Sequence, residues 1–178
     1  IKKTAWGGGN QFLINISNYL KSKNIEVVYD LNDHDIDIIV LMDPRIDSSS
    51  STFNHIDIDK YLKFKNKNAI IIHRINECDE RKGTNYVNKN LIDANKFADY
   101  TIFISSWLRE LLNKNKEFKD SSVILNGANK KIFSFSNFNK NPERRIKIVT
   151  HHWSAHRNKG FEIYEYLDQL LDEKNFSK

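Results

Sequence analysis

The stretch RIKIVTHHWSAHRNKGFEIY, residues 145–164, combines a short apolar run, a polar loop and the start of a helix. Its run of Ile146, Ile148 and Val149 predicts a buried strand. The loop 151–158 has no apolar period, and the helix after it carries apolar side chains at helical spacing, namely Ile163, Leu167, Leu170 and Leu171. A strand that leads into a helix through a polar loop is half of a unit of an open α/β sheet, where ligands bind beyond the carboxyl ends of the strands.

The earlier part of the chain repeats this alternation. The continuous apolar run 36–42 is typical of a strand buried on both faces in a parallel sheet. Further strands are predicted at 26–29, 69–72, 100–104 and 122–125, and helices at about 11–23, 57–64, 86–98 and 106–112. Ser106 is expected to cap the last of these helices. Trp107 is expected to lie in the core or to anchor the start of that helix, and the alternative is a platform on which a sugar stacks. Strands and helices at this spacing predict a parallel sheet with right-handed crossovers.

The predicted fold class is therefore α/β, an open parallel Rossmann-like sheet followed by the first strand–helix unit of a second Rossmann-like domain. The first domain is expected over 1–129, a linker over 130–143 and the start of the second domain over 144–178. A lone strand and helix cannot form a core. We therefore expect the chain to be a fragment, cut off shortly after the second domain begins.

Composition narrows the class of protein. Hydrophobic residues make up 39% of the 178 residues and charged residues 29%, and the mean hydropathy is −0.62. No apolar run approaches the roughly 20 residues that span a bilayer, so a membrane-spanning protein is not expected. The single cysteine, Cys78, cannot form an internal disulfide, which predicts a cytoplasmic location.

Charge is unevenly distributed along the sequence. Residues 1–60 hold six Lys/Arg and nine Asp/Glu, a net charge of −3, which leaves +8 for the remainder of a chain whose total is +5. This favours an anionic partner for the later part of the chain. Nucleic acid is not the expected partner, because the lysines are interspersed with Asn and accompany no recognised motif. The base composition of the genome is an alternative source of the Lys and Asn richness.

Two segments contain candidate site residues. Gly8 and Gly9 would let backbone amides approach an anion, and Asn10 is a plausible N-cap of the following helix. The alternative is that the glycines form only a flexible turn. His73 begins the ionisable run 73–77 at the end of a predicted strand, where an α/β protein places its site, and the alternative is a solvated loop that caps structure.

A metal site is not predicted. His151, His152 and His156 are close together, but no carboxylate or cysteine lies at supporting spacing. Cys78 lies five residues after His73 in the sequence, and this spacing gives no evidence of a nucleophile–base pair.

Five segments together resemble a known family. In order they are AWGGGNQF (5–12), IIHRINECDERKG (71–83), TIFISSWLRELL (101–112), VILNGANKKIF (123–133) and KIVTHHWSAHRNKGFEIY (147–164). Their order and spacing resemble the N-terminal domain and the start of the donor domain of a family 4 (group 1) glycosyltransferase of the two-domain GT-B type. The resembling features are a glycine-rich loop, a strand that ends in histidine, an Asn-Gly element and a Lys-Gly at the start of a helix.

The resemblance implies an activity and roles for particular residues. It implies a hexosyltransferase that moves a sugar from a nucleotide-sugar donor to a glycan or lipid-linked acceptor, with retention, without an essential metal and with no cofactor beyond the nucleotide-sugar co-substrate. His73 would be the catalytic residue near the transferred sugar. Gly8, Gly9 and Asn10 would form the acceptor-side loop. Peripheral association with a membrane fits such an acceptor, and the oligomeric state is left open.

Donor binding would belong to the second domain. Lys159 and Gly160 would meet the donor diphosphate, where a fixed cation or a helix N-terminus stabilises the charge that builds on the leaving group. The family commonly has an arginine about five residues before this lysine, where this chain has Ser154, and Arg157 is the candidate replacement.

Two other classes are alternatives. A non-catalytic glycosyltransferase-like module would bind an acceptor or partner without turnover. A nucleotide-binding enzyme of another class would need a complete glycine fingerprint, which residues 7–9 do not provide.

Overall fold

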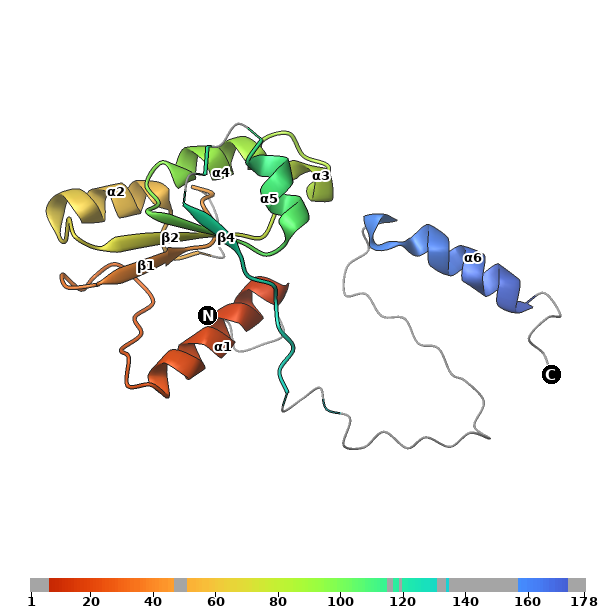
Figure 1. Cartoon of the computed structure of the whole chain (residues 1–178), viewed down its shortest axis with the longest axis horizontal. Coiled ribbons are helices and arrows are strands. Elements are labelled where there is room, and N and C mark those ends of the chain that lie inside the picture. Colours follow the sequence, from red (N-terminus) through yellow and green to blue (C-terminus); the bar gives the residue numbers. More distant parts are fainter. Residues whose placement is uncertain are drawn as a thin grey trace. The chain divides into compact units, whose positions relative to one another are not determined.

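The computed structural model describes residues 7–46, 51–114, 117–118, 120–130, 134 and 157–172. The chain divides into two compact units, 1–127 and 128–178. The first unit holds a four-stranded sheet in the order β1-β2-β3-β4, in which every neighbouring pair is parallel (Figure 1). The strands are β1 (Ile38–Leu41), β2 (Ile70–Ile75), β3 (Tyr100–Phe103) and β4 (Ser121–Val123). The predicted α/β class with a parallel sheet is confirmed.

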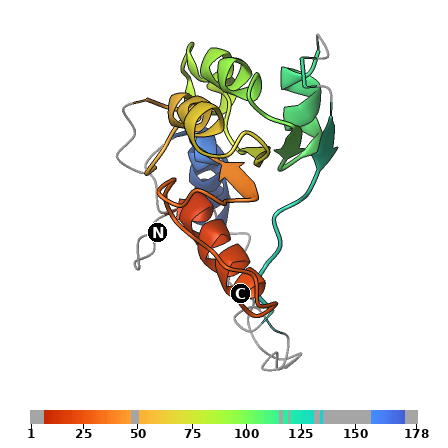
Figure 2. The same cartoon turned by 90° about the vertical axis from the view of Figure 1, so that its left-hand side faces the viewer.

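Helices cover both faces of this sheet. They are α1 (Gly7–Lys21), α2 (His55–Phe64), α3 (Asp79–Lys82), α4 (Val87–Asn95) and α5 (Ser106–Leu112). The crossover helices α2, α4 and α5 lie on one face and α1 lies on the other (Figures 1 and 2). Sheet order follows chain order, so right-handed crossovers place all the connecting helices on the same face.

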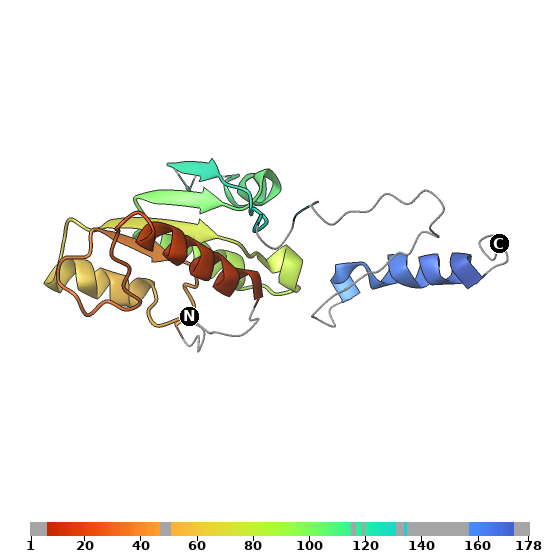
Figure 3. The same cartoon turned by 90° about the horizontal axis from the view of Figure 1, so that it is seen from below.

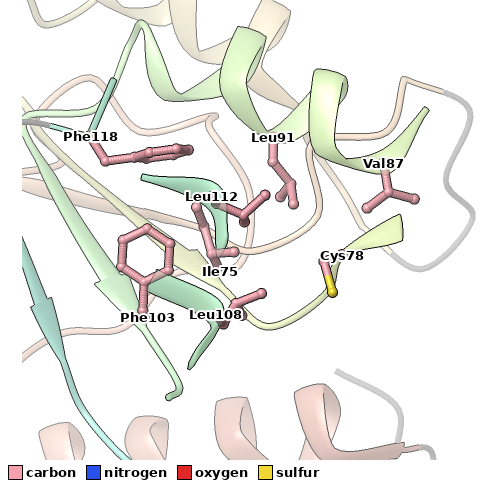
Figure 4. Packing of buried hydrophobic residues seen from close by; sticks show 8 residues of the cluster. All are labelled: Ile75, Cys78, Val87, Leu91, Phe103, Leu108, Leu112 and Phe118. Carbon is pink, nitrogen blue, oxygen red and sulfur yellow. The ribbon is translucent and has the colours of Figure 1, made fainter. Parts of the chain in front are cut away.

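The main core lies between the sheet and the crossover helices, in two clusters. One joins β2 and β3 to α4 and α5, and Figure 4 shows its members: Ile75, Cys78, Val87, Leu91, Phe103, Leu108, Leu112 and Phe118. The other surrounds β1 and α2 and contains Ile39, Leu41, Ile58, Tyr61, Ala69, Ile71 and Ala94. Burial of these apolar side chains is the main driving force for the fold.

Strand register decides which side chains share a face. Leu41 pairs with His73, and His73 pairs with Thr101. Successive residues of a strand point to opposite faces. Leu41 and Phe103 belong to the core under the crossover helices, so His73 faces those helices, while Arg74 faces α1.

Polar side chains fix the helix starts. Asn54 begins α2 with a capping box that it shares with Asp57. Ser105 caps α5 through the Leu108 amide, so the prediction of Ser106 as the cap is wrong by one residue. In α5, Leu108 is buried while Trp107 is 49% exposed, so a core position for Trp107 is wrong, and its role as an anchor at the helix start stays a prediction.

Two of the predicted strands differ from the structure. Residues 26–29 form no strand, and Val28 and Tyr29 are exposed, because this segment pairs with no neighbouring strand of the described sheet. The strand predicted at 69–72 runs on to Ile75, which places His73 and Arg74 inside β2 and not in a loop. Their burial on opposite faces makes this extension possible.

The second unit is described over Arg157–Lys159, a turn of 3-10 helix, and α6 (Phe161–Asp172). The helix predicted from the apolar spacing is confirmed. The predicted strand at 146–149, the loop histidines and nearly all of the 130–143 linker lie outside the described residues. No helix in the described ranges combines the length and apolar character that crossing a membrane requires.

Candidate functional site

The three glycines form the first turn of α1. The helix begins at Gly7, whose φ is 64°, so Gly8, Gly9 and Asn10 lie inside the helix. The predictions that Gly8 and Gly9 lie in a loop and that Asn10 is the N-cap are therefore wrong, while the acceptor-side role of these residues stays a prediction. Glycine is a poor helix former, yet the helix begins here, and the contact between Phe12 and Arg74 joins its second turn to β2. The amides of the first turn of a helix have no partner within the helix and favour anions.

The start of α1 lies at the carboxyl end of the sheet (Figure 3). A Cβ placed on Gly9 would lie 3.8 Å from Nδ2 of Asn76 and 3.8 Å from Cε of Met42, which follow β2 and β1. A Cβ placed on Gly8 would meet no described residue within 4 Å, and Gly8 is exposed. Packing therefore gives no reason for glycine at position 8. A glycine there leaves backbone amides accessible at the edge where open α/β sheets bind ligands.

Arg74 lies on the same face of the sheet, next to α1. The side chain is 4% exposed, and its guanidinium carbon stands 3.9 Å from the centre of the Phe12 ring. Its Nη2 donates to Oδ1 of Asn126 at 2.8 Å, while Nη1 is buried and has no hydrogen-bond partner among the described residues. Burial lowers the pKa of the guanidinium, and arginine nevertheless stays protonated in proteins.

His73 lies on the opposite face of β2 and is fully buried. The side-chain nitrogen of Asn95 donates to Oγ1 of Thr101 at 2.7 Å and lies 3.1 Å from Nδ1 of His73. An amide nitrogen can only donate, so Nδ1 accepts and the neutral ring carries its proton on Nε2. That Nε2 is buried, and no described residue accepts a hydrogen bond from it.

Burial also sets the charge of His73. Desolvation, with a smaller contribution from the charge of His55, lowers the pKa of the imidazole from 6.5 to about 3. The ring is therefore neutral near pH 7. It has no exposed surface that a substrate could touch in this arrangement, and its catalytic role stays a prediction.

In the second unit, Arg157, Lys159 and Gly160 immediately precede α6. Gly160 has a φ of 86°, and its carbonyl accepts from the Tyr164 amide at 3.2 Å, the first bond of the helix. Both Arg157 and Lys159 are exposed. Nη2 of Arg157 lies 3.3 Å from a carboxylate oxygen of Glu165. Cations before a helix N-terminus are electrostatically unfavourable for the helix itself, and an anion bound there relieves this cost.

The described residues provide neither a candidate metal site nor an accessible thiol. Within the part of the chain that the structure describes, no three His, Cys, Asp or Glu side chains lie where they could hold a metal ion. The three loop histidines are outside that part. Cys78 is fully buried in the core, and desolvation is the main cause that raises the pKa of its thiol.

The predicted site residues thus occupy separate places. The glycines lie on the α1 side of the sheet, and His73 lies on the other side. Sequence reasoning did not single out Arg74 and Asn76. The alternation of side chains along a strand could have placed His73 and Arg74 on opposite faces of the sheet. Their hydrogen-bond partners, Asn95 and Asn126, are distant in sequence and could not be inferred from it.

Comparison of the chain with models of protein families, with curated proteins and with solved structures yields no match. The geometry described above is therefore the basis for any functional conclusion.

Proposed function

We propose that this chain is the acceptor-side domain and the beginning of the donor domain of a retaining, metal-independent glycosyltransferase of the GT-B type. The observation that carries the proposal is the exposed glycine turn of α1 at the carboxyl end of a parallel sheet, where no described residue packs closely against Gly8. Glycine in a helix costs up to about 1 kcal/mol relative to alanine. Access of a ligand to the backbone would account for that cost.

The start of α6 supports the donor half of the proposal. Lys159 and Arg157 are exposed cations next to a helix N-terminus, an arrangement suited to a diphosphate. In the reaction, an acceptor hydroxyl oxygen bonds to the anomeric carbon while the bond from that carbon to the diphosphate oxygen breaks. The nucleoside diphosphate leaves with the electron pair, and the hydroxyl proton passes to it or to solvent. A cation at the diphosphate stabilises this charge.

Calorimetric titration of the chain with a panel of nucleoside diphosphates and nucleotide sugars tests the donor site. We expect saturable binding that Lys159→Ala weakens by about tenfold, because one charge-assisted hydrogen bond is lost. Lys60→Ala removes an exposed lysine of α2 and is the matched control, which should bind as the unchanged chain does. A folded chain that binds no member of the panel, or binds equally well without Lys159, would contradict the proposal.

One observation favours the alternative of a non-catalytic binding module. His73, the expected catalytic residue, is fully buried on the face of the sheet away from α1. An enzyme releases free nucleoside diphosphate from the nucleotide sugar when an acceptor or water is present, whereas a module binds the sugar nucleotide and leaves it intact. Chromatography of the incubated nucleotide sugar separates the two functions.

A further inference from the structure

Arg74 is a buried cation for which the described residues supply no carboxylate. Its guanidinium contacts the Phe12 ring and the neutral carboxamide of Asn126, and neither of these groups carries a negative charge. Burial lowers its pKa, and no carboxylate among the described residues counteracts the desolvation. A charge removed from water needs a counter-charge and a full set of hydrogen bonds to offset the cost of desolvation. The stacking on Phe12 offsets only part of it.

The position of Arg74 places this cation under the first turns of α1. Arg74 and Asn76 are two residues apart, at the carboxyl end of β2 and just after it. Phe12 contacts Arg74, and Gly9, one helical turn before Phe12, faces the Asn76 carboxamide. The guanidinium, this carboxamide nitrogen and the start of α1 therefore follow one another along the same side of the sheet. Nη1 of Arg74 is buried and has no described hydrogen-bond partner. This atom is a second indication of a ligand, in addition to the helix N-terminus.

We propose that Arg74, Asn76 and the first-turn amides of α1 form a binding site for a phosphate group. A guanidinium fork presents N–H donors in the geometry that phosphate oxygens accept. The N-terminus of a helix adds backbone donors and a favourable potential. The inference deepens the proposed function, because it assigns a phosphate-bearing ligand to the side of the sheet given there to the acceptor. Its test, however, requires no sugar transfer.

Inorganic phosphate is the first probe. The chain is titrated with sodium phosphate, with sodium chloride added to hold ionic strength constant, and both the dissociation constant and the midpoint of thermal unfolding are measured. We expect saturable binding and a rise in the midpoint with phosphate concentration, since a ligand that binds only the folded state stabilises it. Arg74→Met should raise the dissociation constant by about tenfold to a hundredfold, the loss of one or two charge-assisted hydrogen bonds.

The unfolding midpoint of the Arg74→Met variant, measured with and without phosphate, distinguishes a phosphate-binding arginine from a purely structural one. Replacing an unpaired buried cation by an apolar side chain of similar length should raise the midpoint of unfolding without phosphate, while it removes the phosphate-dependent rise. Lys96→Met removes one positive charge from the end of α4 that pairs with Asp93 and is the control for general electrostatics. Its phosphate affinity should equal that of the unchanged chain.

A second variant tests the site without removing Arg74. Asn76→Asp places a carboxylate beside Gly9, where it repels phosphate, and we expect it to weaken phosphate binding by about tenfold or more at pH 7.5. Affinities unchanged in both Arg74→Met and Asn76→Asp, or no saturable binding by the folded unchanged chain, would overturn the inference. Failure of Lys159→Ala to affect nucleotide sugars, with phosphate binding still dependent on Arg74, would overturn only the donor half of the proposed function.

Three further probes identify the source of the phosphate. A sugar 1-phosphate, a nucleoside diphosphate and vesicles that contain an anionic phospholipid are each tested in competition with inorganic phosphate. Each probe that displaces phosphate in an Arg74-dependent manner supports the site and names its ligand class. If none of the three displaces bound phosphate, the site does not accept a phosphate ester and the inference is overturned.

Discussion

Asp79 and Asn88 exchange two hydrogen bonds. The Asp79 amide donates to Oδ1 of Asn88 at 2.9 Å, and the Asn88 amide donates to Oδ2 of Asp79 at 3.0 Å. Oδ1 of Asp79 also accepts from the amides of Tyr86 and Val87 and from the Thr84 hydroxyl. One carboxylate thus satisfies the amides at the start of α4 and joins α3 to it.

Removing this carboxylate should destabilise the first unit. We expect Asp79→Ala to lower the free energy of unfolding by about 1 to 2 kcal/mol, the cost of a lost helix cap. Urea denaturation followed by circular dichroism measures the change. Asp93→Ala, which removes an exposed carboxylate paired with Lys96, is the control and should cost less than about 0.5 kcal/mol. Equal effects of the two substitutions would show that the Asp79 bonds do not stabilise α4.

The free energy of unfolding should decrease at low pH because His73 is buried as a neutral ring. Its pKa is about 3 in the folded chain and near 6.5 when unfolded, so between these values the unfolded state binds the proton first. The free energy of unfolding then decreases as the pH falls from about 6.5, with a slope that approaches about 1.4 kcal/mol per pH unit.

His73→Gln should remove this part of the pH dependence. Denaturation midpoints measured from pH 7.5 to about 5.5, above the range in which most carboxylates titrate, give the slope for each variant. His34→Gln changes an exposed histidine and should keep the slope of the unchanged chain. A variant without His73 whose slope equals that of the unchanged chain would show that the ring is not buried in the neutral form.

Gly7 and Gly8 should respond in opposite ways to alanine. The φ of 64° at Gly7 is unfavourable for any side chain, so Gly7→Ala should cost about 1 to 2 kcal/mol. The Cβ of Gly8→Ala has free space, and the better helix former should add a few tenths of a kcal/mol up to about 1 kcal/mol. Thermal unfolding of the two variants gives the comparison, and a destabilised Gly8→Ala would contradict the described start of α1.

The aromatic pair in the core should matter more than the exposed tryptophan. The rings of Phe103 and Phe118 meet edge to face with centroids 5.3 Å apart, and both side chains are buried. Phe118→Ala should lower the free energy of unfolding by about 3 to 5 kcal/mol. Trp107→Ala, at an exposed position of α5, should change it by well under half of that, and a larger effect of Trp107 would contradict the packing in Figure 4.

The sheet could be predicted because strands buried in a parallel sheet consist of continuous apolar residues. The run 36–42 contains β1, and the helix predicted at 86–98 contains α4, in which Val87, Leu91 and Ala94 are buried. The apolar run at 26–29 misled the prediction, because a strand also needs a neighbour to pair with, and local sequence does not report this.

The site was less predictable than the fold. The glycine run was interpreted as a loop because local propensity argues against a helix, whereas in the structure these residues form the first turn of α1. Polar residues such as His73 and Arg74 were placed in a loop because their burial depends on partners 22 and 52 residues further along the chain. Single-sequence patterns do not contain such partnerships.

The strand order also affects how the chain can fold. Each of β2, β3 and β4 pairs with the strand that precedes it in the sequence, as Ile71 does with Ile39 and Ser121 with Thr101. No strand has to insert between two that have already paired, and each crossover closes over one short segment. A sheet of this order can grow in one direction from β1 to β4 as the chain leaves the ribosome, so each new strand finds its template already in place.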